Sequence, residues 1–118
     1  MGQPGCPIER AADVLSGKWT LLILRELFTG TQRFGTLRAA LPGISPKTLT
    51  ERLRILEEQG ILRRTIYPEI PPRVEYTLTD LGQTLAPIIA AMRAWGEQWA
   101  PQLVQRPVPV GDDKGTLT

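Results

Sequence analysis

The chain has 118 residues, of which 42% are hydrophobic, and a formal net charge of +2. This length fits one globular domain, and so small a charge does not by itself indicate a nucleic-acid-binding protein. With one cysteine and no histidine, the chain cannot form an intrachain disulfide, a Cys/His zinc cluster or a histidine-dependent nucleophile. We therefore expect no metal and no cofactor, and an enzyme is the least favoured class of function.

The sequence shows no signal peptide and no apolar run of the roughly 20 residues that a membrane span needs. We expect a cytoplasmic protein that does not contact membranes. Positive charge gathers in the middle of the chain, where residues 33–76 hold eight Lys or Arg and five Glu. DNA affinity, if present, must therefore come from well-placed contacts rather than from long-range attraction.

The first half of the chain predicts three helices. Residues 7–15 begin with a proline and have one apolar face. Residues 18–29 are apolar almost all round, which is typical of a buried central helix. Residues 31–33 are a short extended piece, and residues 34–41 form a short helix that ends at the Pro42-Gly43 break.

Another helix follows this break, and the sequence gives a clear signal for its N-terminus. Ser45 is a predicted N-cap, Pro46 suits the first helical position, and Gly60 ends the helix. A short helix, a tight turn and a second helix are the layout of a helix-turn-helix. Residues 61–67 and 73–78 read as two strands joined by a proline-rich turn, and a hairpin in this place is a wing.

The helix from residue 46 to about residue 59 would read DNA. Leu49, Leu53 and Leu56 must face the core, which turns a polar face outward. A recognition helix uses its N-terminal residues at base edges, and wing or loop arginines contact phosphate or the minor groove. The candidate DNA-binding residues are Arg33, Ser45, Lys47, Thr48, Thr50, Glu51, Arg54 and Arg73. The alternative is an ordinary solvated face on an amphipathic helix.

The last predicted helix runs from Asp80 to about Trp99, after an N-cap at Thr79. Its apolar residues follow a heptad-like spacing, and Pro87 should kink or split it. The apolar stripe exceeds what so small a core covers, which favours self-association, although part of it must pack on the core. The candidate dimer-interface residues are Ile8, Leu85, Ile88, Met92, Trp95 and Trp99. We expect a domain over residues 1–104 with terminal dimerisation helices, and a disordered tail over residues 105–118.

Several segments together resemble the HxlR-type winged helix-turn-helix regulators, relatives of the MarR group. They are Cys6-Pro7 with Glu9, GKWTLLILREL at 17–27, RFGTLRAALPGISPKTLTERLRILEEQGIL at 33–62, YPEIPPRVEYTLTDLG at 67–82, LAPII at 85–89 and AWG at 94–96. The resemblance covers about residues 6–97. It implies a mainly α fold with a small β-hairpin, and a homodimeric repressor or activator on an inverted-repeat operator. It also implies that the first and last helices build the dimer.

Cys6 lies at the start of the first helix, where the helix dipole favours a thiolate. In some members of the resembled family, a cysteine at the matching place senses oxidants or electrophiles. The alternative is an idle cysteine. The function predicted overall is sequence-specific DNA binding and transcription regulation. A winged-helix module that binds another protein, without DNA specificity, is the alternative.

Overall fold

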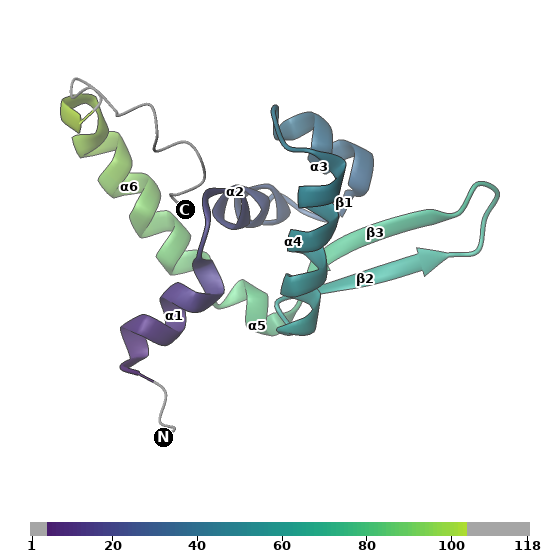
Figure 1. Ribbon diagram of the computed structural model, residues 1–118, viewed down its shortest axis with the longest axis horizontal. Helices are drawn as coiled ribbons and strands as arrows, with labels where there is room; N and C mark the ends of the chain where they lie inside the picture. Colours follow the sequence, from purple (N-terminus) through teal and green to yellow (C-terminus); the bar gives the residue numbers. More distant parts are fainter. Residues whose placement is uncertain (1–4, 104–118) are drawn as a thin grey trace.

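The structure is a computed structural model that describes residues 5–103 (Figure 1). The expected fold class, mainly α with a small antiparallel sheet, is confirmed. The helices are α1 (Pro7–Leu15), α2 (Lys18–Leu27), α3 (Phe34–Ala40), α4 (Pro46–Glu58), α5 (Asp80–Gln83) and α6 (Ala86–Leu103). The strands are β1 (Gln32–Arg33), β2 (Leu62–Tyr67) and β3 (Arg73–Leu78). The predicted tail, residues 105–118, lies outside the described residues.

The start of α4 is fixed by local chemistry. The Ser45 hydroxyl accepts a hydrogen bond from the Thr48 backbone N–H at 3.0 Å, as an N-cap does. Pro46 takes the first helical position, where a missing N–H costs nothing. At the other end, Gly60 has φ +78°, a left-handed conformation that glycine adopts without strain. Both ends of the helix agree with the sequence prediction.

The sheet has one strand more than the predicted hairpin. Its order is β1-β3-β2, with both pairs antiparallel. The short extended piece at residues 31–33 supplies β1, whose residues Gln32 and Arg33 pair with Tyr76 and Glu75 of β3. In the hairpin itself, Leu62 lies opposite Leu78 and Tyr67 opposite Arg73. The wing therefore projects from a three-stranded base, well beyond the helices (Figure 1).

The hydrophobic core lies between α2, α3, α4 and the base of the sheet. Its buried apolar residues are Ile23, Leu24, Leu27, Leu37, Leu41, Ile44, Leu49, Leu53, Leu56, Ile61, Leu62, Tyr76 and Leu78. The central helix α2 contributes three of them, as expected, although Trp19, Leu21 and Leu22 keep part of their surface exposed. This core fixes the face that α4 turns outward, because Leu49, Leu53 and Leu56 are all inside it.

The C-terminal helix is split rather than continuous. The break lies between α5 and α6, so Pro87 is the second residue of α6, where its missing N–H interrupts nothing. The predicted split near Pro87 is confirmed, and Leu81 belongs to a separate short helix, so the heptad-like seam does not run through one continuous helix. Leu85 and Ile89 pack against the core, and α6 then projects away from it (Figure 1). The helix continues to Leu103, past its expected end near Trp99.

No helix within residues 5–103 is both long and apolar enough to cross a lipid bilayer.

Candidate nucleic-acid interface

The outward face of α4 gathers four of the predicted DNA-binding residues. Lys47, Thr50, Glu51 and Arg54 are all exposed and, with Pro46, line one shallow hollow on this helix. They fall at helical spacing on the side opposite the buried leucines, so their polar groups point to solvent together. Such a face offers lysine and arginine to guanine or phosphate, threonine to a base or a thymine methyl, and glutamate to cytosine.

Ser45 and Thr48 are held at the helix start rather than presented freely. The Ser45 hydroxyl donates to Thr48 Oγ1 at 3.0 Å while it accepts from the Thr48 backbone N–H. Thr48 is also half-buried. Both side chains therefore stabilise the N-terminus of α4, and this fixes the position of Lys47 and Thr50 beside them.

Arg54 is paired along its own helix. Its guanidinium lies 2.7 Å from the Glu58 carboxylate, one turn further on, and both side chains are more than half exposed. An exposed i,i+4 pair is weak. The pair therefore orients Arg54 without preventing it from contacting DNA.

Arg33 and Arg73 lie near the wing, away from α4. Arg33 is exposed at the end of β1 and lines a pocket of about 400 Å³ together with residues 69–73 of the wing turn. Arg73 is paired with two carboxylates: its guanidinium is 2.8 Å from Glu69 and 2.5 Å from Glu75. It also stacks on the Tyr67 ring at 3.8 Å. Arg73 was predicted to contact phosphate or the minor groove from the wing tip; its guanidinium is bound by two carboxylates, and the DNA contact stays a prediction.

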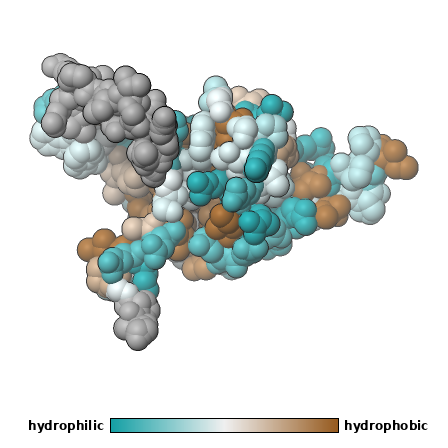
Figure 2. All heavy atoms as spheres, viewed as in Figure 1, coloured by the Kyte–Doolittle hydropathy of each residue, from teal (hydrophilic) through white to brown (hydrophobic). Residues whose placement is uncertain are grey.

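The ion pair changes the chemistry of both partners. The hydrogen bond from Arg73 holds the pKa of Glu69 below its usual range, and the two carboxylates raise the pKa of Arg73. Both groups therefore stay ionised at neutral pH. Ile70, in the turn of the wing, is fully exposed. Figure 2 shows apolar residues at the far end of the wing (brown, far right).

Arg64 and Tyr76 lie between α4 and the wing; strand alternation predicted that at most one of Arg63 and Arg64 could contact DNA, and Tyr76 had no predicted role in the site. Arg64 lies opposite Tyr76 across the β2–β3 pair, so both side chains share one face of the sheet. Arg64 also reaches Glu57 of α4 at 3.8 Å. Strand alternation places Arg63 on the opposite face. The alternation was visible in the sequence, but the register that joins Arg64 to Tyr76 was not.

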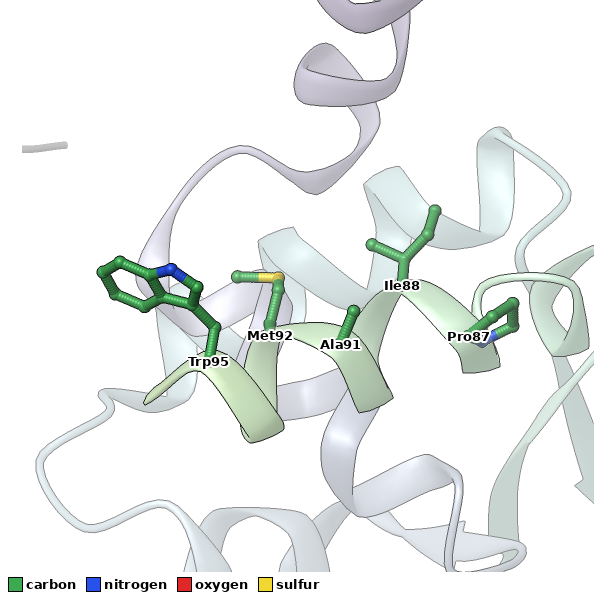
Figure 3. A pocket seen from close by; sticks show the side chains of 5 residues that line it. All are labelled: Pro87, Ile88, Ala91, Met92 and Trp95. Carbon is green, nitrogen blue, oxygen red and sulfur yellow. The ribbon is translucent and has the colours of Figure 1, made fainter. Parts of the chain in front are cut away.

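A second surface, on α6, is apolar. Pro87, Ile88, Ala91, Met92 and Trp95 line an open hollow of about 510 Å³ along this helix. Figure 3 shows their side chains along one side of α6. Trp95 is 57% exposed, and Trp99, one turn on, is 40% exposed. Of the predicted dimer-interface residues, the structure brings Ile88, Met92, Trp95 and Trp99 together and places Leu85 against the core.

Ile8 lies in α1 and Cys6 directly precedes this helix, which is at the opposite end of the molecule from the wing (Figure 1). Ile8 is 78% exposed, and no residue of α1 is buried. Cys6 is an exposed free cysteine at the N-cap position. Its backbone N–H donates to Glu9 Oε1 at 3.1 Å, so Glu9 closes the start of the helix.

These features together form a recognition helix preceded by a short helix and followed by a wing. The model of the HxlR-like helix-turn-helix family matches residues 14–104. The chain belongs to the HxlR-like family. The relatives of this HxlR-like chain are transcriptional regulators: sll1512 of Synechocystis sp., an HTH-type transcriptional regulator, is 55% identical over 97 residues, covering 82% of this chain and 72% of sll1512.

Solved structures agree with the HxlR-like assignment. The redox regulator HypR in its reduced form superposes with a TM-score of 0.82 at 40% identity, covering 86% of this chain and all of that one. The reduced form of the transcriptional regulator YodB from B. subtilis gives a TM-score of 0.71 at 39% identity, covering 81% of this chain and 95% of YodB. This chain is therefore an HTH-type regulator with a MarR-like winged-helix fold.

Proposed function

We propose that this HxlR-like regulator binds a specific DNA operator through the exposed face of α4. The observation that carries the proposal is the cluster of Lys47, Thr50, Glu51 and Arg54 on one outward face, beside a wing. These four side chains supply donors, acceptors and a methyl group, which the major groove distinguishes base by base. Arg33 lies at the sheet edge, where a phosphate contact fits.

The operator-binding unit is a homodimer. The apolar stripe of Ile88, Met92, Trp95 and Trp99 lies on a helix that projects from the core. Exposed apolar patches of this kind mark interfaces, and a two-fold partner offers the same stripe in return. A symmetric dimer presents two recognition helices to an inverted repeat, with half-site centres about 34 Å apart or a multiple of this distance.

Cys6 is the proposed signal-sensing residue. It is exposed at the start of α1, and among the similar structures HypR has reduced and oxidized forms while YodB has a diamide-treated form. With one cysteine per chain, a disulfide of Cys6 forms either with Cys6 of a second subunit or with a small thiol: two thiols give two electrons and two protons to the oxidant, and one S–S bond forms. An electrophile instead adds to the thiolate sulfur directly.

The experiment is fluorescence anisotropy of a labelled duplex from upstream of the gene, with an unrelated duplex as control. We expect tight, salt-dependent binding to the upstream duplex and a weaker preference after treatment with diamide or a quinone. The Cys6→Ser variant should bind the upstream duplex as tightly as the parent, and the treatment should not change its affinity. Equal affinity for both duplexes would favour the alternative of a protein-binding module.

A further inference from the structure

A small pocket lies where the recognition helix meets the wing. It measures about 160 Å³ and is lined by Thr50, Leu53, Arg54, Glu57, Arg64 and Tyr76. Thr50 and Arg54 also line the hollow on the outward face of α4. The pocket therefore adjoins the surface proposed to contact DNA, and its lining joins α4 to strands β2 and β3 of the wing.

The Tyr76 hydroxyl is the first feature that indicates a ligand-binding site. Tyr76 is 8% exposed and its ring belongs to the core. No hydrogen bond within residues 5–103 uses its hydroxyl, and no fully enclosed polar side-chain atom there lacks a partner, so the hydroxyl keeps some contact with solvent on a residue that lines the pocket. Burial raises the pKa of Tyr76, so the phenol keeps its proton and is a hydrogen-bond donor.

Arg64 is the second feature. It lies directly across the β2–β3 pair from Tyr76, which places the guanidinium and the phenol on one face of the sheet. Its carboxylate partner, Glu57, is 3.8 Å away, at the outer limit of an ion pair, and both side chains keep more than a third of their surface exposed. So loose a pair in solvent is weak. The guanidinium therefore has N–H donors to offer to a second anion.

We propose that this pocket binds one phosphate of the DNA backbone, with the Tyr76 hydroxyl and the Arg64 guanidinium as donors; this rests on the proposed DNA-binding function. A backbone phosphate is the occupant because the pocket adjoins the α4 face on one side and the wing on the other. It fixes the depth at which α4 enters the major groove, since phosphate contacts set register and orientation. Glu57 competes with the phosphate for Arg64.

Four variants test the site: Tyr76→Phe, Arg64→Gln, Glu57→Gln and, as a matched control on the opposite face of β2, Arg63→Gln. Dissociation constants are measured against salt on the upstream duplex and on a random duplex. Tyr76→Phe should weaken binding to both roughly threefold to tenfold, the effect of one hydrogen bond. Arg64→Gln should weaken both by about tenfold or more and reduce the salt slope by about one.

Glu57→Gln is the variant whose effect a purely structural role does not explain. Removing the competing carboxylate should tighten binding to both duplexes roughly twofold to fivefold and steepen the salt dependence. Arg63→Gln should stay within about twofold of the parent. Unchanged affinity for Tyr76→Phe, or equal losses for Arg64→Gln and Arg63→Gln, would overturn the site.

The two proposals fail in different ways. A phosphate contact carries no sequence information, so the variants act equally on the random duplex even if the parent prefers neither duplex. If the parent protein does not prefer the upstream duplex but the pocket variants still change affinity, only the operator proposal is overturned. If the parent prefers the upstream duplex but the pocket variants bind as the parent does, only the phosphate pocket is overturned. Absence of binding to any duplex overturns both. Saturable binding of inorganic phosphate at Tyr76, beyond that of chloride at equal ionic strength and unaffected by DNA, would assign the pocket to a free anion instead.

Discussion

The Arg73 guanidinium lies 2.8 Å from the Glu69 carboxylate, at the point where the wing turns back toward the sheet. Glu75 contacts the same guanidinium, and Tyr67 stacks beneath it. Four residues of the two wing strands and their turn are thus joined through one side chain. These contacts use three of the five guanidinium N–H donors, so Arg73 stabilises the shape of the wing and still has donors for a DNA phosphate.

The Glu69–Arg73 pair predicts a measurable titration. Because Arg73 holds the pKa of Glu69 below its unfolded value, the pair stabilises the fold above the unfolded pKa and loses this contribution as the pH falls through the folded pKa. In Arg73→Gln the Glu69 midpoint should rise toward that of an ordinary glutamate. Carboxyl-detected NMR titration of both proteins measures it. Identical midpoints would show that the pair is absent in solution.

Gly82 predicts a large effect on stability. It is buried, and a Cβ at this position would fall well inside van der Waals contact with the Ile61 carbonyl oxygen, a backbone atom that cannot move aside cheaply. Gly82→Ala should lower the free energy of unfolding by about 1–3 kcal/mol, and more if the backbone does not relax. Gly35→Ala is the control, because nothing lies within 4 Å of its Cβ. In that helical position it should be neutral or stabilise by up to about 1 kcal/mol. Denaturant unfolding compares the two, and equal stabilities would contradict the close approach.

The α6 stripe predicts the effect of a charge on assembly. Trp95→Glu places a carboxylate in the proposed interface, where burial without a partner is unfavourable. It should convert dimer to monomer in sedimentation velocity and weaken operator binding strongly. The control is Ala90→Glu, which adds the same charge to an exposed position on the side of α6 away from Trp95. Dimers of unchanged affinity in Trp95→Glu would place the interface elsewhere.

Substitution of Thr50 should reduce the preference for the operator over other DNA more than it reduces the affinity for DNA in general. Its exposed side chain lies between Lys47 and Arg54 on the recognition face, where it can bond a base or touch a thymine methyl. Thr50→Ala should reduce the preference for the operator over a random duplex by about tenfold, while the affinity for the random duplex changes little. Competition anisotropy gives both values. A parallel loss on the two duplexes would assign Thr50 to the backbone.

The sequence predicted those features that neighbouring residues determine. The limits of α4 follow from Ser45, Pro46 and Gly60, and its outward face follows from the spacing of its leucines. Features that depend on distant partners could not be predicted in this way. The pairing of β1 with β3 and the position of Arg64 opposite Tyr76 depend on strand register.

Two further differences have the same cause. The ion pairs of Arg73 could not be predicted, because Glu69 and Glu75 are brought to it only when the wing turn closes. The apolar spacing from Leu81 to Trp99 suggested one seam. The chain breaks before α6, as Pro87 predicted, and the spacing did not show that Ile89 joins Leu85 in packing against the core. In each case the structure depends on contacts between residues that the local sequence pattern does not relate.

If two copies of α4 read an inverted repeat, selection of bound duplexes from a random-sequence library should reveal it. We expect enrichment of a palindromic motif whose half-site centres lie about 10 base pairs apart, or a multiple of this. The enrichment should disappear in Trp95→Glu and change its base preference in Thr50→Ala. A library that stays random after repeated rounds, or a single unrepeated motif, would contradict it.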